Sequence, residues 1–99
     1  MKTPLDFQQF KESLSELQPP KNWPLALQSL WYDAKGDWES SHNIAQDLHT
    51  SMGSWIHAYL HRKEGDGWNA GYWYRQAGRP FPGHSLEEEL QELVEFALR

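Results

Sequence analysis

The sequence predicts an all-α domain of about six helices, stacked as antiparallel helical hairpins with a C-terminal capping helix. Apolar residues recur every three or four positions in one segment after another, as on the buried face of a helix. Glycine-aspartate pairs separate successive helical segments at two places, and no segment has the pattern of a strand. A chain of 99 residues suits one hydrophobic core, so we expect a single domain over residues 1–99.

The first helix is expected to start at Thr3 and to stop before Pro19 and Pro20. Thr3 supplies a capping hydroxyl, Pro4 fits the first helical position, and Asp6 adds an acid to the first turn. The two prolines cannot continue a helix. The apolar stripe of this helix consists of Phe7, Phe10, Leu14 and Leu17.

The next two helices are expected to form a hairpin over residues 23–48. Trp23 and Pro24 open the first of them, and Gly36 ends it, because the left-handed conformation at a helix end favours glycine. Asp37 can cap the following helix, expected over 38–48. The buried faces of the two helices carry Leu27, Leu30, Trp31 and Ala34, and then Trp38, Ser41, Ile44, Ala45 and Leu48.

A second hairpin with the same junction is expected over residues 51–77. Thr50 or Ser51 caps a helix that runs to about Glu64, and Gly65 and Asp66 repeat the glycine-aspartate turn before a helix over 68–77. A proline-containing loop over 78–83 follows. The last helix opens with the capping box of Ser85 to Glu88, and its stripe consists of Leu86, Leu90, Leu93, Val94 and Ala97.

Two stretches of the chain carry a family resemblance. Residues 57–66 spell HAYLHRKEGD, residues 69–78 spell NAGYWYRQAG, and residues 31–38 with His42 precede them. These segments resemble a small bacterial family of uncharacterised proteins over about half of the chain, a likeness that implies no particular activity. More loosely, residues 64–77 are similar to short tetratricopeptide-like repeats, which implies scaffolding or partner binding and not catalysis.

Composition narrows the classes of function. The net charge of −5 disfavours nucleic acid as a partner, because binding to phosphate backbones needs a basic surface. The absence of cysteine excludes disulfides, thiolate metal sites and thiol nucleophiles. No segment approaches the roughly 20 apolar residues that span a bilayer, and no signal-like segment is evident, so we expect no membrane association and a cytoplasmic location.

Histidines supply the one candidate metal site. His57, His61 and Glu64 are spaced i, i+4 and i+7 and therefore share one helix face, to which His42 of the preceding helix could add a ligand. Imidazoles and a carboxylate suit zinc or another divalent metal as a cofactor. The alternative is that these histidines lie at the edge of the core and bond to a carboxylate or a backbone carbonyl.

Polar and aromatic side chains also gather around the second glycine-aspartate turn, where they could form a small pocket for a peptide or a metabolite. In the alternative interpretation Asp66 only caps a helix and Arg75 pairs with Glu64. The acidic run 87–89 and the basic side chains near helix ends are expected to be solvated. The candidate binding residues are His61, Arg62, Glu64, Asp66, Asn69, Tyr72, Trp73 and Arg75.

The leading functional hypothesis is a small soluble protein-interaction module that is not an enzyme and holds no cofactor. Its unusual residues are the aromatic side chains of 68–77, which suit pairing with a protein partner or with a second copy. The alternative is a metal-binding protein or a small metalloenzyme that uses the histidine and glutamate cluster. No candidate catalytic triad, phosphate-binding glycine loop or dinucleotide fingerprint is visible.

Overall fold

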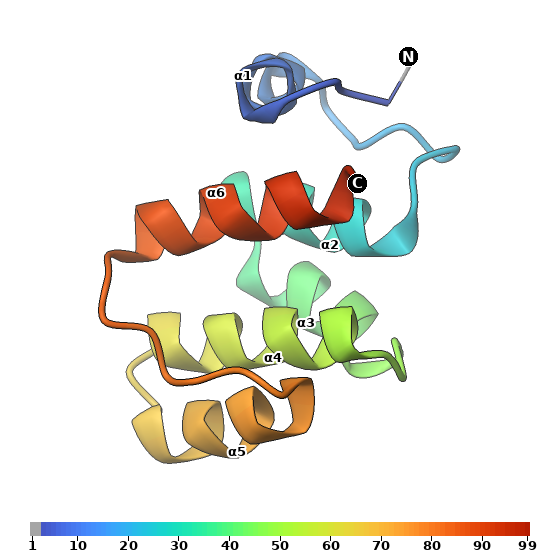
Figure 1. Cartoon of the computed structure of the whole chain (residues 1–99). Coiled ribbons are helices and arrows are strands. Elements are labelled where there is room, and N and C mark those ends of the chain that lie inside the picture. Colours follow the sequence, from blue (N-terminus) through green and yellow to red (C-terminus); the bar gives the residue numbers. More distant parts are fainter. Residues whose placement is uncertain (1–2) are drawn as a thin grey trace.

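Helices account for all the regular secondary structure of residues 3–99, which are the residues described by this computed structural model (Figure 1). This confirms the all-α fold of about six helices. None of these helices is long and apolar enough to cross a bilayer. The elements are α1 (Phe7–Glu12), the 3-10 helix η1 (Ser13–Ser15), α2 (Leu25–Ala34), α3 (Trp38–Gln46), α4 (Ser51–Lys63), α5 (Gly67–Ala77) and α6 (Leu86–Ala97).

Helix α4 occupies the centre of the molecule. In Figure 1 it lies between α6 on one side and α5 on the other, with α3 behind it, and it contacts α2, α3, α5 and α6. The six consecutive residues from Trp55 to Leu60 are all buried, although an amphipathic helix would expose about half of them. The other helices of the two hairpins and the capping helix therefore pack around α4.

The two hairpins have the same backbone geometry at their junctions. Gly36 and Gly65 adopt φ values of 88° and 89°. The N–H groups of Asp37 and Asp66 each donate to a carbonyl five residues earlier at 2.9 Å, and their carboxylates accept from the third residue of the next helix. One glycine-aspartate pair thus closes a helix with a left-handed residue and opens the following one with a side-chain cap.

A buried carboxylate connects α6 to the hairpin of α4 and α5. The acidic run 87–89 was expected to be solvated, and this is wrong for Glu89, which is 1% exposed. Its Oε1 accepts from Arg62 at 2.8 Å, and its Oε2 accepts from the Tyr74 hydroxyl at 2.6 Å and the Trp55 indole at 3.1 Å. Three donors compensate the carboxylate for the loss of water. Arg62 is therefore not a solvated helix-end charge either.

A second buried carboxylate connects α2 to α4. Asp33 accepts from the Tyr59 hydroxyl at 2.9 Å and from Lys63 Nζ at 3.0 Å. Desolvation and the neighbouring Asp33 carboxylate raise the pKa of Tyr59, so its hydroxyl stays protonated and serves as a donor. Together, Asp33 and Glu89 hold α4 from both sides.

The expected N-terminal helix is shorter than predicted. Its N-cap is Asp6, whose carboxylate accepts from the N–H of Gln9 at 2.9 Å, and not Thr3. The chain tightens into η1 and leaves the helix at Glu16 with extended backbone. Leu17 therefore lies beyond the helix and is 94% exposed, so its place in the apolar stripe is also wrong.

Helix boundaries elsewhere match the expectation closely. Helix α3 ends two residues early, at Gln46, and α5 starts one residue early, at Gly67. The capping box of Ser85 and Glu88 is present, and Thr50 caps α4.

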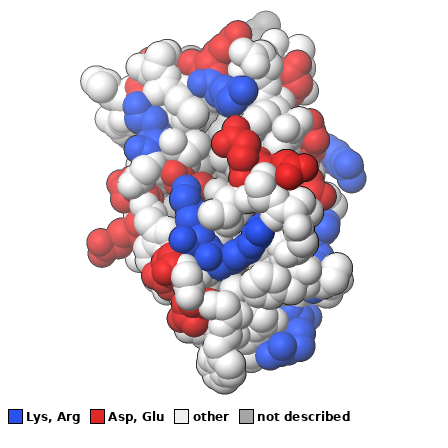
Figure 2. All heavy atoms as spheres, turned by 90° about the vertical axis from the view of Figure 1, so that its left-hand side faces the viewer, with Lys and Arg blue, Asp and Glu red and all other residues white. Residues whose placement is uncertain are grey.

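Charge on the face drawn in Figure 2 is mixed, with basic side chains in the middle of the view and acidic ones beside them, so this face has no extended basic surface.

The junction geometry predicts different effects on stability for alanine at Gly65 and at Gly67. Gly65→Ala should destabilise the protein by about 1 kcal/mol, because alanine at φ 89° is strained even in open space. Gly67→Ala should leave stability unchanged or raise it by roughly 0.5 kcal/mol, because this helical position has room for a methyl group. Urea unfolding of both variants measures the difference, and equal effects would contradict the left-handed turn.

Candidate metal centre

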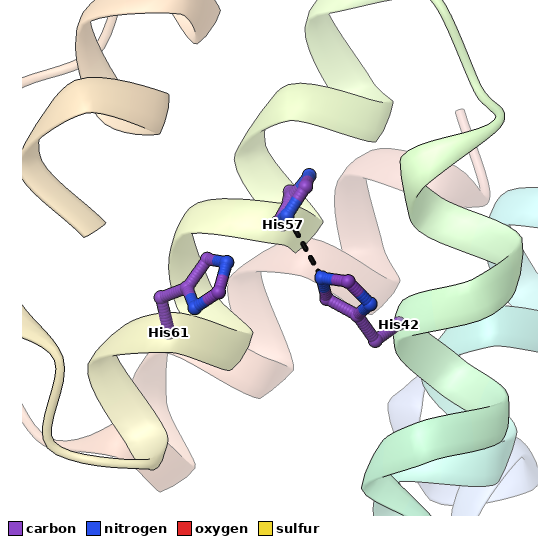
Figure 3. Close-up of side chains that lie close together, drawn as sticks. All are labelled: His42, His57 and His61. Atoms are coloured by element: carbon purple, nitrogen blue, oxygen red, sulfur yellow. Dashed lines mark hydrogen bonds between the residues drawn. The ribbon is translucent and has the colours of Figure 1, made fainter. Parts of the chain in front are cut away.

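Three histidines converge where α3 meets α4. His42 comes from α3, and His57 and His61 lie one helical turn apart on α4 (Figure 3). One ring nitrogen from each histidine lies within 4.8 Å of the other two. The expected helix-face spacing of His57 and His61 is present, and the packing of the two helices brings His42 to it.

His42 and His57 share a hydrogen bond. Their Nε2 atoms are 2.9 Å apart, so one ring donates and the other accepts. The pKa of His57 is lowered to about 4. Burial of the ring is the largest cause, and electrostatic repulsion by His42 and then by His61 contributes less. Burial and then His61 also lower the pKa of His42. Both rings are therefore neutral at pH 7, which is the form that ligates metals.

Two tryptophans hold these rings in place. The His42 ring stacks on Trp38 with centroids 4.8 Å apart, and the His57 ring stacks on Trp73 of α5 at 4.0 Å. The Trp38 indole N–H donates to the carbonyl of Leu60 at 2.9 Å, which fixes that wall to α4. The imidazoles of the two histidines are thus oriented by packing and not only by their mutual hydrogen bond.

Glu64 orients the third histidine. Its Oε1 lies 2.7 Å from His61 Nδ1, so Nε2 is the nitrogen of His61 that remains available to a ligand. Glu64 was itself expected to be a metal ligand. In line with that expectation, a second group of possible ligands, His61, Glu64 and Asp66, has its ligand atoms within 4.8 Å of one another. This second group is more exposed than the three-histidine group, and it would compete for the same His61 ring.

The candidate pocket residues around the second glycine-aspartate turn are divided among different contacts. Asp66 caps α5 and bonds to Asn69, as the alternative interpretation held for Asp66. The remaining members divide as follows: His61 and Glu64 bond to each other, Arg62 turns to Glu89 of α6 and the His84 carbonyl, Trp73 stacks on His57, and Tyr72 and Arg75 are exposed. No ion pair joins Arg75 and Glu64 within residues 3–99.

Trp73 was among the candidate binding residues, whereas Trp38 and the buried acids Asp33 and Glu89, which contact α4, were not predicted to have such contacts. Trp38 precedes His42 by four residues, a spacing that places the two rings on one helix face and could have indicated the stacking. Asp33 and Glu89 each lie three residues after a leucine of an apolar stripe. An acid within such a stripe is a signal for a buried carboxylate that needs donors.

Comparison of the chain with protein-family models, with curated proteins and with solved structures finds no match. The candidate metal centre therefore stands on the geometry of the residues themselves.

The lowered pKa of His57 predicts a loss of stability in acid. An unfolded histidine has a pKa near 6.5, so between about pH 6.5 and 4 the unfolded chain binds more protons than the folded one at this ring. The free energy of unfolding should fall as the pH decreases through this window, with a His57 contribution of up to about 3 kcal/mol. His42 and His61 face the same ring and contribute to the lowered pKa of His57.

This dependence can be measured by urea unfolding at several pH values in the presence of a chelator. The His57→Gln variant should show a shallower decline than the parent protein, whereas a variant of the exposed His49, His49→Gln, should follow the parent. Parallel curves for the parent and His57→Gln would contradict the assignment.

Proposed function

We propose that this protein binds one divalent cation of the zinc type through His42, His57 and His61. The observation that carries the proposal is the convergence of three ring nitrogens from two helices to within 4.8 Å of one another. Helices α3 and α4 bring together residues that lie 15 or more positions apart, so local spacing alone does not explain the cluster. Neutral imidazoles are common ligands of zinc, copper and nickel.

Small side-chain movements would complete the coordination geometry. Tetrahedral ligation with bonds of about 2.05 Å separates two ligand nitrogens by roughly 3.3 Å. The His42 and His57 nitrogens, now 2.9 Å apart, would separate slightly, and the cation would replace their hydrogen bond. The third nitrogen would approach by at most about 1.5 Å, which rotation of an imidazole about its side-chain torsions can supply.

Glu64 supports this assignment as a positioning residue. A carboxylate bonded to Nδ1 fixes the tautomer of a metal-binding histidine, orients its ring and raises the basicity of the ligating Nε2. The 2.7 Å contact between Glu64 and His61 has this arrangement. Glu64 also supplies a negative charge beside a cation held by three neutral ligands.

The ligand count favours a site with an accessible coordination position. Three protein ligands leave one tetrahedral position for water or an exogenous ligand, which is the pattern of catalytic zinc sites, whereas structural sites use four protein ligands. His42 and His61 are only partly buried, so solvent reaches the edge of the cluster. A metal-binding domain with an open coordination position is therefore the function that we propose.

Zinc titration of tag-free, chelator-treated protein tests the proposal. Calorimetry should show one equivalent bound, with a Kd of about 1 µM or tighter. His42→Gln, His57→Gln and His61→Gln should each weaken binding by at least about 100-fold, because each removes a ligand. Glu64→Gln should weaken it by about 10- to 100-fold, because it alters only the orientation and basicity of His61.

His49→Gln is the matched control, since His49 is exposed and lies outside the cluster. Cobalt substitution adds a second measurement, because the visible absorption of Co²⁺ differs between tetrahedral and octahedral sites. Binding that survives in His57→Gln, or that disappears equally in His49→Gln, would contradict the three-histidine site. Circular dichroism of each variant checks that its helices are intact.

A second candidate function is self-association through α5. This helix lies at one end of the molecule, and its outer face carries Trp68, 83% exposed, and Tyr72, 42% exposed, one turn apart (Figure 1). Large exposed aromatic side chains are enriched in protein interfaces, where they bury much area at a small cost in side-chain entropy. Two copies related by a twofold axis would cover the same face on each.

Sedimentation measurements test self-association. The parent protein should form dimers at concentrations of tens of micromolar, and Trp68→Ser should shift the equilibrium toward monomer by about 10-fold or more, because a buried tryptophan is a frequent interface hot spot. Phe81→Ser is the matched control, since Phe81 is 51% exposed and lies in the loop after α5. A parent protein that stays monomeric at these concentrations would contradict this function.

A further inference from the structure

Arg79, in the loop that leaves α5, is held by aromatic rings and not by a carboxylate. Its guanidinium lies 3.4 Å from the centroid of the Trp55 ring and 5.2 Å from that of Phe96. Within residues 3–99, no side-chain hydrogen bond or ion pair involves this guanidinium. The backbone N–H of Arg79 donates to the Tyr74 carbonyl. Stacking orients the flat face of the guanidinium and leaves the N–H edges for a ligand.

The two acids that line the small cavity beside Arg79, Glu89 and Glu92, contact other groups. Both oxygens of Glu89 accept hydrogen bonds, from Arg62, Tyr74 and Trp55. Glu92 pairs with His84. Within residues 3–99, neither of these carboxylates forms an ion pair with Arg79.

The guanidinium borders a pocket of about 310 Å³. The apolar part of its wall includes Met52 and Trp55 of α4, Ala77 of α5 and Phe96 of α6. The pocket also touches the start of α4 and the end of α5, whose opposite dipoles offset each other, so Arg79 supplies the charge. The volume is near the lower limit for ligand pockets, which suits a small molecule.

We propose that this pocket binds a small monocarboxylic acid with a compact apolar group, such as an aryl-substituted acetate. The carboxylate would accept two parallel hydrogen bonds from the edge of the Arg79 guanidinium, and the apolar group would lie against Phe96 and Met52. Charge complementarity supports this choice, because an unpaired cation at an apolar wall matches an anion with an apolar body. The pocket lies on the opposite side of α4 from His57, since Trp55 and His57 are two positions apart on the helix.

Calorimetric titration with phenylacetate tests the proposal on the full chain. We expect a Kd of about 1 mM or tighter, and binding of the neutral amide, phenylacetamide, at least about 10-fold weaker. Arg79→Gln should weaken phenylacetate binding by at least about 10-fold, and Arg79→Lys should weaken it several-fold, because lysine keeps the charge without the planar pair of donors. The experiment is run with and without the chelator, because the site does not involve the histidines.

Arg75→Gln is the matched control, since it removes the same charge from an exposed position of α5 outside the pocket. It should bind phenylacetate as the parent does. Equal binding of the amide, unchanged binding by Arg79→Gln, or no binding by the parent at millimolar concentrations would each overturn the proposal. Thermal unfolding of the Arg79 variants checks that any loss of binding occurs in folded protein.

Discussion

The middle of α4, from Trp55 to Leu60, is buried on all sides, and this burial dictates how the neighbouring helices are arranged. A helix that is buried all round cannot leave its polar side chains to water, so each must find a partner in a neighbouring element. Glu89 and Asp33 provide these partners, and between them they connect α6, α5 and α2 to α4. Replacing either acid would leave donors buried without an acceptor, a cost that apolar packing alone does not incur.

This central packing also creates the histidine cluster. His57 is buried because it lies within the covered stretch of α4, and its ring stacks on Trp73 of α5 and bonds to His42 of α3. His42 meets it because the α3 helix crosses α4 where Trp38 bonds to the Leu60 carbonyl. The features that bring the imidazoles together are therefore features of the fold, while the Glu64 contact with His61 is local to the end of α4.

The two proposed sites use different sides of α4. The histidines lie on the side of α4 that faces α3, and the Arg79 pocket lies where the start of α4, the end of α5 and α6 meet. Each site contains a tryptophan that stacks on a functional side chain. The high tryptophan content of this short chain thus serves orientation as well as core filling, since an indole ring fixes the plane of an imidazole or a guanidinium.

Features that arise from contacts between near neighbours could be predicted from the amino-acid sequence alone. Helix ends, the capping box and both glycine-aspartate junctions depend on residues fewer than six positions apart, and so does the shared face of His57 and His61. The convergence of His42 with that face, the burial of Glu89 and the contact of Arg62 with Glu89 could not be predicted in this way. These features depend on which helices meet, and that depends on the packing of the whole core.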